Sequence, residues 1–120
     1  MEKGKTNSVA KLEPSPKKGV IAAPDFLNII KNSPLSIILL DVRSEEEAEA
    51  GVIPQSLLIP ADKVLERLSE IPSDGDIVVY CRSGLRAEMV YSLLEERGYS
   101  VRYLPSTLDI KKDGSFTIIN

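Results

Sequence analysis

The feature of this sequence most suited to chemistry is its single cysteine, Cys81, together with the short segment that follows it. A thiol acts as a nucleophile in its thiolate form, which helix N-termini, backbone amides and nearby cations stabilise. Cys81 follows an apolar run at 77–80 and precedes a glycine-containing loop and then a helical pattern. Such a junction lets backbone N–H groups and a helix dipole converge on one anion. We therefore predict that Cys81 is a nucleophile and that the loop of Arg82, Ser83, Gly84, Leu85 and Arg86 stabilises an anion, first of all the Cys81 thiolate.

The amino-acid counts restrict how this cysteine can be activated. The chain has no histidine, which excludes Cys-His and Ser-His-Asp catalysis of the usual kind. One cysteine also excludes an intrachain disulfide, a C-x-x-C redox pair and a cysteine-based zinc site. The loop amides, with Arg82 or Arg86, must then stabilise the thiolate. The alternative is a small buried cysteine that only packs, and a loop with two arginines and a glycine disfavours that interpretation.

Composition indicates one ordinary globular domain. The chain has 120 residues, of which 42% are hydrophobic and 28% charged, and its net charge is −3, so nothing argues for a nucleic-acid surface. Residues 1–19 lack apolar periodicity and are predicted to be a disordered tail, with the folded domain at 20–120. Apolar runs such as that at 37–40 are far too short to span a bilayer. We expect a cytoplasmic protein without membrane partners, although a periplasmic protein whose signal peptide was removed is equally compatible.

Strand and helix signals alternate along the chain and must position the cysteine. Apolar runs predict strands at 20–21, 37–40, 57–59, 77–80 and 101–104. Helical patterns begin at Pro24, run from 44 to 50, lie between 60 and 72, and extend from 87 to 97, while 108–119 is typical of a hairpin. This order predicts an α/β domain of three layers (α/β/α) with a central, mainly parallel sheet. Ligands of such sheets bind beyond the carboxyl ends of the strands, where both Asp41 and Cys81 fall.

Two motifs in this order carry a resemblance to a known family. The first comprises Asp41-Val42-Arg43, then Glu46-Glu47, then residues 51–54; the second is the loop at 81–86, forty residues after Asp41. With both motifs, the chain resembles a rhodanese-like domain, a single-domain sulfurtransferase, over about residues 20–108. The resemblance implies thiosulfate sulfurtransferase-like activity through a persulfide on the catalytic Cys81. It also implies that Arg82, Ser83, Gly84, Leu85 and Arg86 form the substrate-binding loop, whose backbone amides hold the persulfide. It also implies that Arg82 and Arg86 attract an anionic donor such as thiosulfate.

The same resemblance implies the partners of the reaction. The donor would be thiosulfate or a persulfide, and the acceptor a thiol, cyanide or a sulfur-acceptor protein. Neither a cofactor nor a metal is required. Asp41, Arg43 and Glu47 would support the site, and two interpretations of Asp41 and Arg43 remain. We favour a structural pair in which Arg43 bridges to Glu46 or Glu47, because an arginine fork suits a nearby carboxylate; the alternative is direct substrate contact.

Loop length and departures from the family pattern define the rival functions. Phosphatases and arsenate reductases of the same fold use a Cys-x5-Arg loop, whereas this chain has Cys-x4-Arg, which favours sulfur over a phosphoryl group. Ser106-Thr107 replaces the usual paired glycine, and a hairpin replaces the last helix, which leaves the donor open. The other rivals are a non-catalytic binding or regulatory module and a redox sensor in which Cys81 forms a sulfenic acid.

Overall fold

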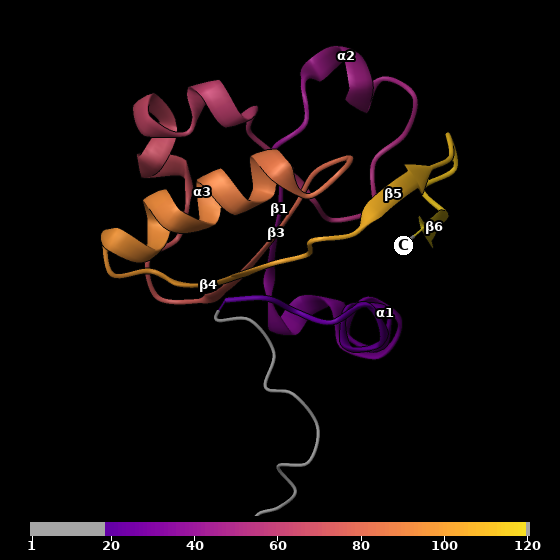
Figure 1. Ribbon diagram of the computed structural model, residues 1–120, viewed down its shortest axis with the longest axis horizontal. Helices are drawn as coiled ribbons and strands as arrows, with labels where there is room; N and C mark the ends of the chain where they lie inside the picture. Colours follow the sequence, from indigo (N-terminus) through magenta and orange to yellow (C-terminus); the bar gives the residue numbers. More distant parts are fainter. Residues whose placement is uncertain (1–18, 120) are drawn as a thin grey trace, which may run out of the picture.

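The computed structural model describes residues 19–119, so the predicted tail falls outside the described residues except for Gly19. The described chain forms one α/β arrangement (Figure 1). In chain order its elements are α1 (Ala23–Asn32), η1 (Pro34–Ser36), β1 (Ile38–Asp41), α2 (Glu45–Ala48), β2 (Leu57–Leu58), η2 (Ala61–Lys63), η3 (Leu65–Glu70), β3 (Asp76–Tyr80), α3 (Leu85–Glu96), β4 (Ser100–Tyr103), β5 (Thr107–Ile110) and β6 (Phe116–Ile119).

The central sheet has four parallel strands in the order β2-β1-β3-β4. Asp41 is in register with Leu58 on one side and with Tyr80 on the other, so the last residues of these strands meet at one edge. Cys81 follows Tyr80 directly, and the two motifs are therefore neighbours in space. The predicted α/β class with a central parallel sheet is confirmed. The predicted C-terminal hairpin is present as a separate antiparallel pair, β5 and β6.

Helices cover both faces of this sheet, as the alternating side chains of β3 require. Ile77, Val79 and Cys81 join a cluster with α3 and the η2–η3 segment, whereas Val78 and Tyr80 join a cluster with α1 and the hairpin. Figure 1 shows α3 and α1 on opposite sides of the strands. Because side chains of one strand alternate between two apolar layers, the strand end is fixed from both sides. That rigidity positions the residue that follows β3.

Three elements differ from the sequence-based expectation. The predicted strand at 20–21 is a single bridge from Val20 to Tyr103, because the chain turns into α1 almost at once. The helical pattern between 60 and 72 forms two short 3-10 segments, and Arg67 (φ −118°) interrupts the second. Helix α3 begins at Leu85, two residues earlier than predicted, so the loop is shorter and Arg86 lies in the first helical turn. None of the helices in the described part of the chain is both long and apolar enough to cross a membrane.

Candidate active site

The thiol of Cys81 lies inside the turn that joins β3 to α3. Its Sγ accepts hydrogen bonds from the backbone N–H of Gly84 at 3.0 Å and of Ala87 at 3.4 Å. Ala87 is the third residue of α3, and its N–H is one of those that an N-cap side chain normally satisfies. The sulfur therefore replaces a capping oxygen, since Gly84 at the N-cap position has no side chain. Negative charge on this sulfur would be favoured by the helix dipole as well as by the two amides.

Gly84 is required by the backbone of this turn. Its φ is +95°, a left-handed conformation that side chains rarely adopt. A Cβ placed there would lie 2.4 Å from the carbonyl oxygen of Pro105. The loop therefore packs against the segment after β4, and the hydrogen bond from Leu108 N–H to the Arg82 carbonyl oxygen (2.8 Å) fixes the same contact further along. Replacing the glycine would displace the amide that binds the sulfur.

Cys81 is deeply placed, while the rim of its loop is at the surface. The residue is 1% exposed and packs in one cluster with Val42, Ala87 and Val90. Arg82, Ser83 and Leu85 are exposed. The Cys81 side chain therefore packs against apolar residues while its sulfur accepts two amide hydrogen bonds. These hydrogen bonds distinguish it from a buried thiol that only fills space.

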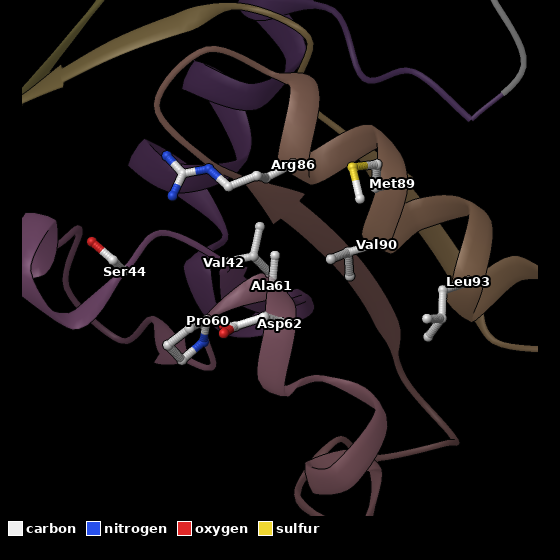
Figure 2. Close-up of a pocket in the computed structure, with 9 residues that line it drawn as sticks. All are labelled: Val42, Ser44, Pro60, Ala61, Asp62, Arg86, Met89, Val90 and Leu93. Carbon is white, nitrogen blue, oxygen red and sulfur yellow. The ribbon is translucent and has the colours of Figure 1, made fainter.

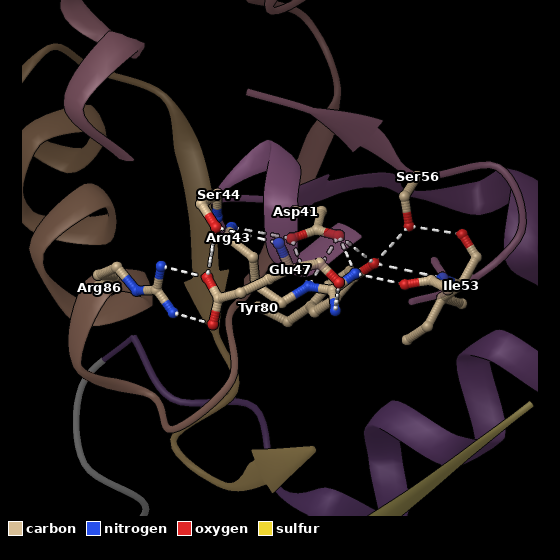
Figure 3. Close-up of polar contacts among 9 residues, drawn as sticks. Asp41, Arg43, Ser44, Glu47, Ile53, Ser56, Tyr80 and Arg86 are labelled. Atoms are coloured by element: carbon tan, nitrogen blue, oxygen red, sulfur yellow. Dashed lines mark hydrogen bonds and ion pairs between the residues drawn. The ribbon is translucent and has the colours of Figure 1, made fainter. Parts of the chain in front are cut away.

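Arg86 projects from the first turn of α3 to the carboxylate of Glu47 on α2 (Figure 3). Its Nη1 and Nη2 donate to Oε1 and Oε2 at 2.7 and 3.0 Å, the bidentate form of an arginine–carboxylate pair. The hydrogen bond from Arg86 is the main cause that lowers the pKa of Glu47 to about 2, and the bonds from Ser44 add to it. The pKa of Arg86 is raised by the same contact. Both groups therefore stay ionised over the physiological range, and each neutralises the other.

Ser44 fixes Glu47 through a complete capping box. The Ser44 hydroxyl accepts the Glu47 N–H at 3.1 Å, and Glu47 Oε1 accepts the Ser44 N–H at 3.0 Å. This reciprocal pair fixes the start of the short α2. The carboxylate that binds Arg86 is thus itself held in place, and α2 is tied to α3 across the loop.

Asp41 and Arg43 form a buried ion pair at the end of β1 (Figure 3). Asp41 is 0% and Arg43 6% exposed, and the guanidinium donates from Nε and Nη2 to the Asp41 carboxylate at 2.8–3.1 Å. A second bond from Nη2 reaches the Gly51 carbonyl oxygen at 2.7 Å. Burial alone would lower the pKa of Arg43, but its bonds and ion pair with Asp41 outweigh burial and raise that pKa.

Tyr80 completes this polar cluster from the neighbouring strand. Its hydroxyl donates to Asp41 Oδ2 at 3.0 Å and lies 2.8 Å from the Ser56 hydroxyl. The Arg43 guanidinium carbon lies 5.9 Å from the centre of the Tyr80 ring. Burial, with the nearby Asp41 carboxylate, raises the pKa of Tyr80 well above its usual range. Tyr80 and Ser56 were not among the predicted site residues; the one available signal was the position of Tyr80 at the end of a predicted strand, directly before Cys81.

The predicted partner of Arg43 was wrong in one respect. Arg43 meets Glu47 only through a 3.5 Å contact to its backbone carbonyl oxygen, and its guanidinium pairs with Asp41 instead. The Glu47 carboxylate binds Arg86. The reason is geometric, because Arg43 is buried and turns back toward the strand end while Glu47 faces the loop. The structural interpretation of Asp41 and Arg43 is favoured by their burial.

Two hollows flank the loop, and Cys81 is among the lining residues of neither. One, of about 430 Å³, lies between α3 and η2 and is largely apolar (Figure 2); its lining residues are Val42, Ser44, Pro60, Ala61, Asp62, Arg86, Met89, Val90 and Leu93. The other, of about 470 Å³, is more polar and includes Arg82, Glu47 and Asp109 beside the hairpin. Arg82 and Arg86 are therefore directed to different sides of the loop, and their joint attraction of an anionic donor remains a prediction.

An α/β sheet that carries a cysteine cradled at a strand–helix junction defines the structural class of this protein. The family model of the rhodanese-like domain matches residues 22–106, and the chain belongs to this family. It is similar to a sulfurtransferase of Allochromatium vinosum, with 41% identity over 52% of this chain and 59% of that protein. This chain thus matches less than two thirds of the length of that relative.

Solved structures show the same fold. A rhodanese-related protein of Thermoplasma volcanium is 26% identical and has a TM-score of 0.66 over 73% of this chain and 84% of that one. The human single-domain sulfurtransferase TSTD1 is 24% identical, with a TM-score of 0.61 over 74% of this chain and 90% of that one. At that identity the second likeness shows the fold alone.

Proposed function

We propose that this protein is a sulfurtransferase that carries a sulfane sulfur as a persulfide on Cys81. The observation that supports it most directly is the pair of amide hydrogen bonds to Sγ, at the N-terminus of a twelve-residue helix. Backbone N–H groups keep their protons at neutral pH. They already point at the sulfur, so they need not move when negative charge develops on it. Membership of the rhodanese-like family and the similarity to a named sulfurtransferase agree with this chemistry.

The reaction consists of two half-reactions. In the first, the Cys81 thiolate attacks the outer sulfur of thiosulfate, the S–S bond of the donor breaks, and sulfite leaves with the bonding electron pair. With a persulfide donor R–S–SH the leaving group is the thiolate R–S⁻. In the second, a thiol or cyanide attacks the outer sulfur of the Cys81 persulfide and regenerates the thiolate. This is covalent catalysis with ping-pong kinetics.

The surrounding residues have positioning roles in this proposal. Gly84 and Ala87 present the amides, and Gly84 permits the turn. The Glu47–Arg86 pair ties α2 to the first turn of α3 and so fixes the direction of the Ala87 N–H. Asp41 and Arg43 anchor the strand end beside the loop. Ser83 and Leu85 are exposed at the rim, where donor and acceptor must enter.

Intact-mass spectrometry after exposure to thiosulfate tests the proposal. We expect the full chain to gain the mass of one sulfur atom and to lose it again when cyanide is added, with thiocyanate released. The Cys81→Ser variant, which keeps the size of the side chain, should gain nothing. A wild-type chain that stays at its original mass with thiosulfate and with persulfide donors would contradict the proposal and favour a binding module. Turnover of phosphate esters without sulfur uptake would favour the phosphatase alternative.

A further inference from the structure

A strand at the edge of a sheet carries backbone N–H and C=O groups that no neighbouring strand binds, and proteins usually cover or shorten such edges. The central sheet follows this rule at both edges. Strand β2 has only two residues. At the end of β4, the Tyr103 N–H donates to the Gly19 carbonyl oxygen at 2.7 Å, and the Tyr103 carbonyl oxygen accepts the Ile21 N–H at 2.9 Å. The hairpin of β5 and β6 forms a separate sheet with two further edges.

One edge of the hairpin is bound to the Cys81 loop. The Leu108 N–H on β5 donates to the Arg82 carbonyl oxygen at 2.8 Å, so the backbone groups of Leu108 point away from β6. Leu108 is in register with Ile118. Hydrogen-bonded and non-hydrogen-bonded positions alternate in an antiparallel pair, so Ile118 and Phe116 direct their own N–H and C=O groups away from β5. These groups form the outer edge of β6.

This outer edge of β6 is open. Within residues 19–119 no strand pairs with it, and neither Phe116 nor Ile118 makes a backbone hydrogen bond outside the hairpin. Figure 1 shows the hairpin at one side of the molecule, beyond the end of β4. The strand reads Phe116-Thr117-Ile118-Ile119, without the lysine, the proline or the inward charge that usually guards an edge. The edge is therefore suited to accept a further strand.

The side chains of β6 fit a second copy of the same strand. Phe116 and Ile118 pack on the apolar cluster beneath the hairpin, whereas Thr117 and Ile119 are exposed on its other face. When two β6 strands run antiparallel about a twofold axis at Thr117, Phe116 of each copy lies opposite Ile118 of the other. Thr117 then lies opposite its own counterpart. Aromatic–β-branched and Thr–Thr pairs are favourable cross-strand neighbours, and the strand has no charge that would repel its copy.

We propose that two copies of this chain associate through their β6 edges, so that their hairpins form one four-stranded antiparallel sheet across a twofold axis. This inference goes beyond the proposed function, because it assigns a partner to a surface that the sulfur chemistry does not use. One short strand from each copy buries less surface than a stable dimer requires. We therefore expect a weak association that depends on protein concentration.

Sedimentation velocity of the full chain tests the association. Between about 5 and about 500 µM, the weight-average mass should rise from that of one chain toward that of two. Thr117→Lys places two lysines opposite each other at the axis and should keep the chain monomeric, whereas Thr117→Val should preserve the dimer. Ser73→Lys adds the same charge at an exposed position outside the hairpin and should leave the association unchanged.

A cross-link tests the register of the two strands. In a Cys81→Ser background, Thr117→Cys would place one thiol from each copy in a non-hydrogen-bonded pair with Cα atoms about 4.5 Å apart, within disulfide reach. Mild oxidation should then give a covalent dimer. Asp109→Cys is the control, because Asp109 lies opposite Thr117 in the hairpin and would be three strand spacings, about 14 Å, from its counterpart.

Three results would overturn the proposal. The first is a chain that stays monomeric up to about 500 µM. The second is a dimer that Thr117→Lys leaves intact, and the third is a cross-link that Asp109→Cys forms as readily as Thr117→Cys, because the contact would then lie elsewhere. Sulfur uptake by Cys81 is measured separately, and the proposed function stands or falls independently of these results.

Discussion

Asp41 and Cys81 both lie buried at the carboxyl edge of the sheet, but different kinds of group hold them. The Asp41 carboxylate accepts hydrogen bonds from the Arg43 guanidinium and the Tyr80 hydroxyl, and one from the Arg43 main-chain N–H, so side chains supply most of its donors. The Cys81 sulfur accepts hydrogen bonds from two main-chain N–H groups at a helix start. A buried charge saturated by side chains is stable and unreactive, whereas a sulfur held by backbone dipoles can change charge and bonding without displacing its partners.

This contrast assigns structure to one cluster and chemistry to the other. Removing a member of the Asp41 cluster should mainly reduce the free energy of unfolding. Altering the Cys81 turn should mainly reduce sulfur uptake. Substitutions in each region can therefore test whether stability and sulfur uptake depend on different residues.

The largest effect on stability is expected from Asp41→Ala. It leaves the Arg43 guanidinium buried without its carboxylate, and breaking a buried pair in this way costs about 3–5 kcal/mol. Because a small domain has a total stability of about 5–15 kcal/mol, urea unfolding at pH 7 should show a large fall in midpoint. Asp109→Ala, which removes an exposed ion pair with Lys111, should leave the midpoint nearly unchanged. If the two variants had equal urea midpoints, the Asp41–Arg43 pair would not anchor the strand end.

The largest effect on chemistry short of removing Cys81 is expected from Gly84→Ala. The new Cβ would meet the Pro105 carbonyl oxygen and displace the Gly84 amide, so sulfur uptake should slow by about a hundredfold. Gly98→Ala is the matched control, since Gly98 also has a positive φ (+86°) but open space around its Cβ position. That control should cost about 1 kcal/mol of stability and leave the uptake rate unchanged. If Gly84→Ala took up sulfur as fast as Gly98→Ala, the Gly84 amide would not be needed to hold the sulfur.

Tyr80→Phe tests the link between the two regions, because Tyr80 belongs to the Asp41 cluster and directly precedes Cys81. Loss of the hydroxyl removes a hydrogen bond to a buried carboxylate, for which we expect a stability loss of about 1.5–3 kcal/mol. Sulfur uptake should change much less than in Gly84→Ala. Tyr91→Phe, on α3 and outside this cluster, controls for the substitution itself. A Tyr80→Phe variant with normal stability and impaired sulfur uptake would show that the Asp41 cluster contributes to the chemistry and not to stability.

Much of the fold and the position of the thiol could be predicted because local patterns determine them. The apolar run before Cys81 is short and rich in β-branched residues, which favours a buried strand. Gly84 marks the turn, and Lys112-Asp113-Gly114 marks the hairpin. The early start of α3 could not be predicted, because it depends on a sulfur acting as the helix cap. Sequence spacing contains no signal for that contact.

The pairing of charges was the least predictable part of the site. Arg43 has carboxylates at Asp41, Glu46 and Glu47 within reach along the chain, and only burial of the strand end selects Asp41. The contact between Glu47 and Arg86 spans 39 residues and depends on how α2 and α3 pack around the loop. The apolar hollow likewise combines three separate segments, so spacing alone could not reveal it.

The smallest effect is expected from Glu47→Gln, and it depends on pH. The pKa of Glu47 falls from its usual value of 4.5 to about 2 in the folded chain, mainly through the hydrogen bond from Arg86. The group therefore stabilises the fold fully above pH 4.5, and this contribution is lost as pH falls toward 2. We expect about 1 kcal/mol after allowance for solvent screening, seen as a difference in urea midpoint between variant and wild type at pH 7 that shrinks at pH 3.

The same variant also tests the charge of Arg86, because it removes the negative charge paired with this guanidinium and changes no group that contacts the sulfur. Without the paired carboxylate, Arg86 would attract a dianion more than a singly charged donor. In Glu47→Gln, kcat/KM for thiosulfate should therefore rise relative to methanethiosulfonate, CH₃–SO₂–S⁻, which donates the same outer sulfur but carries one negative charge. Glu70→Gln, which breaks an exposed pair with Arg67, should leave that ratio unchanged. An unchanged ratio in Glu47→Gln would mean that Arg86 acts only as a tie between helices, whatever its charge.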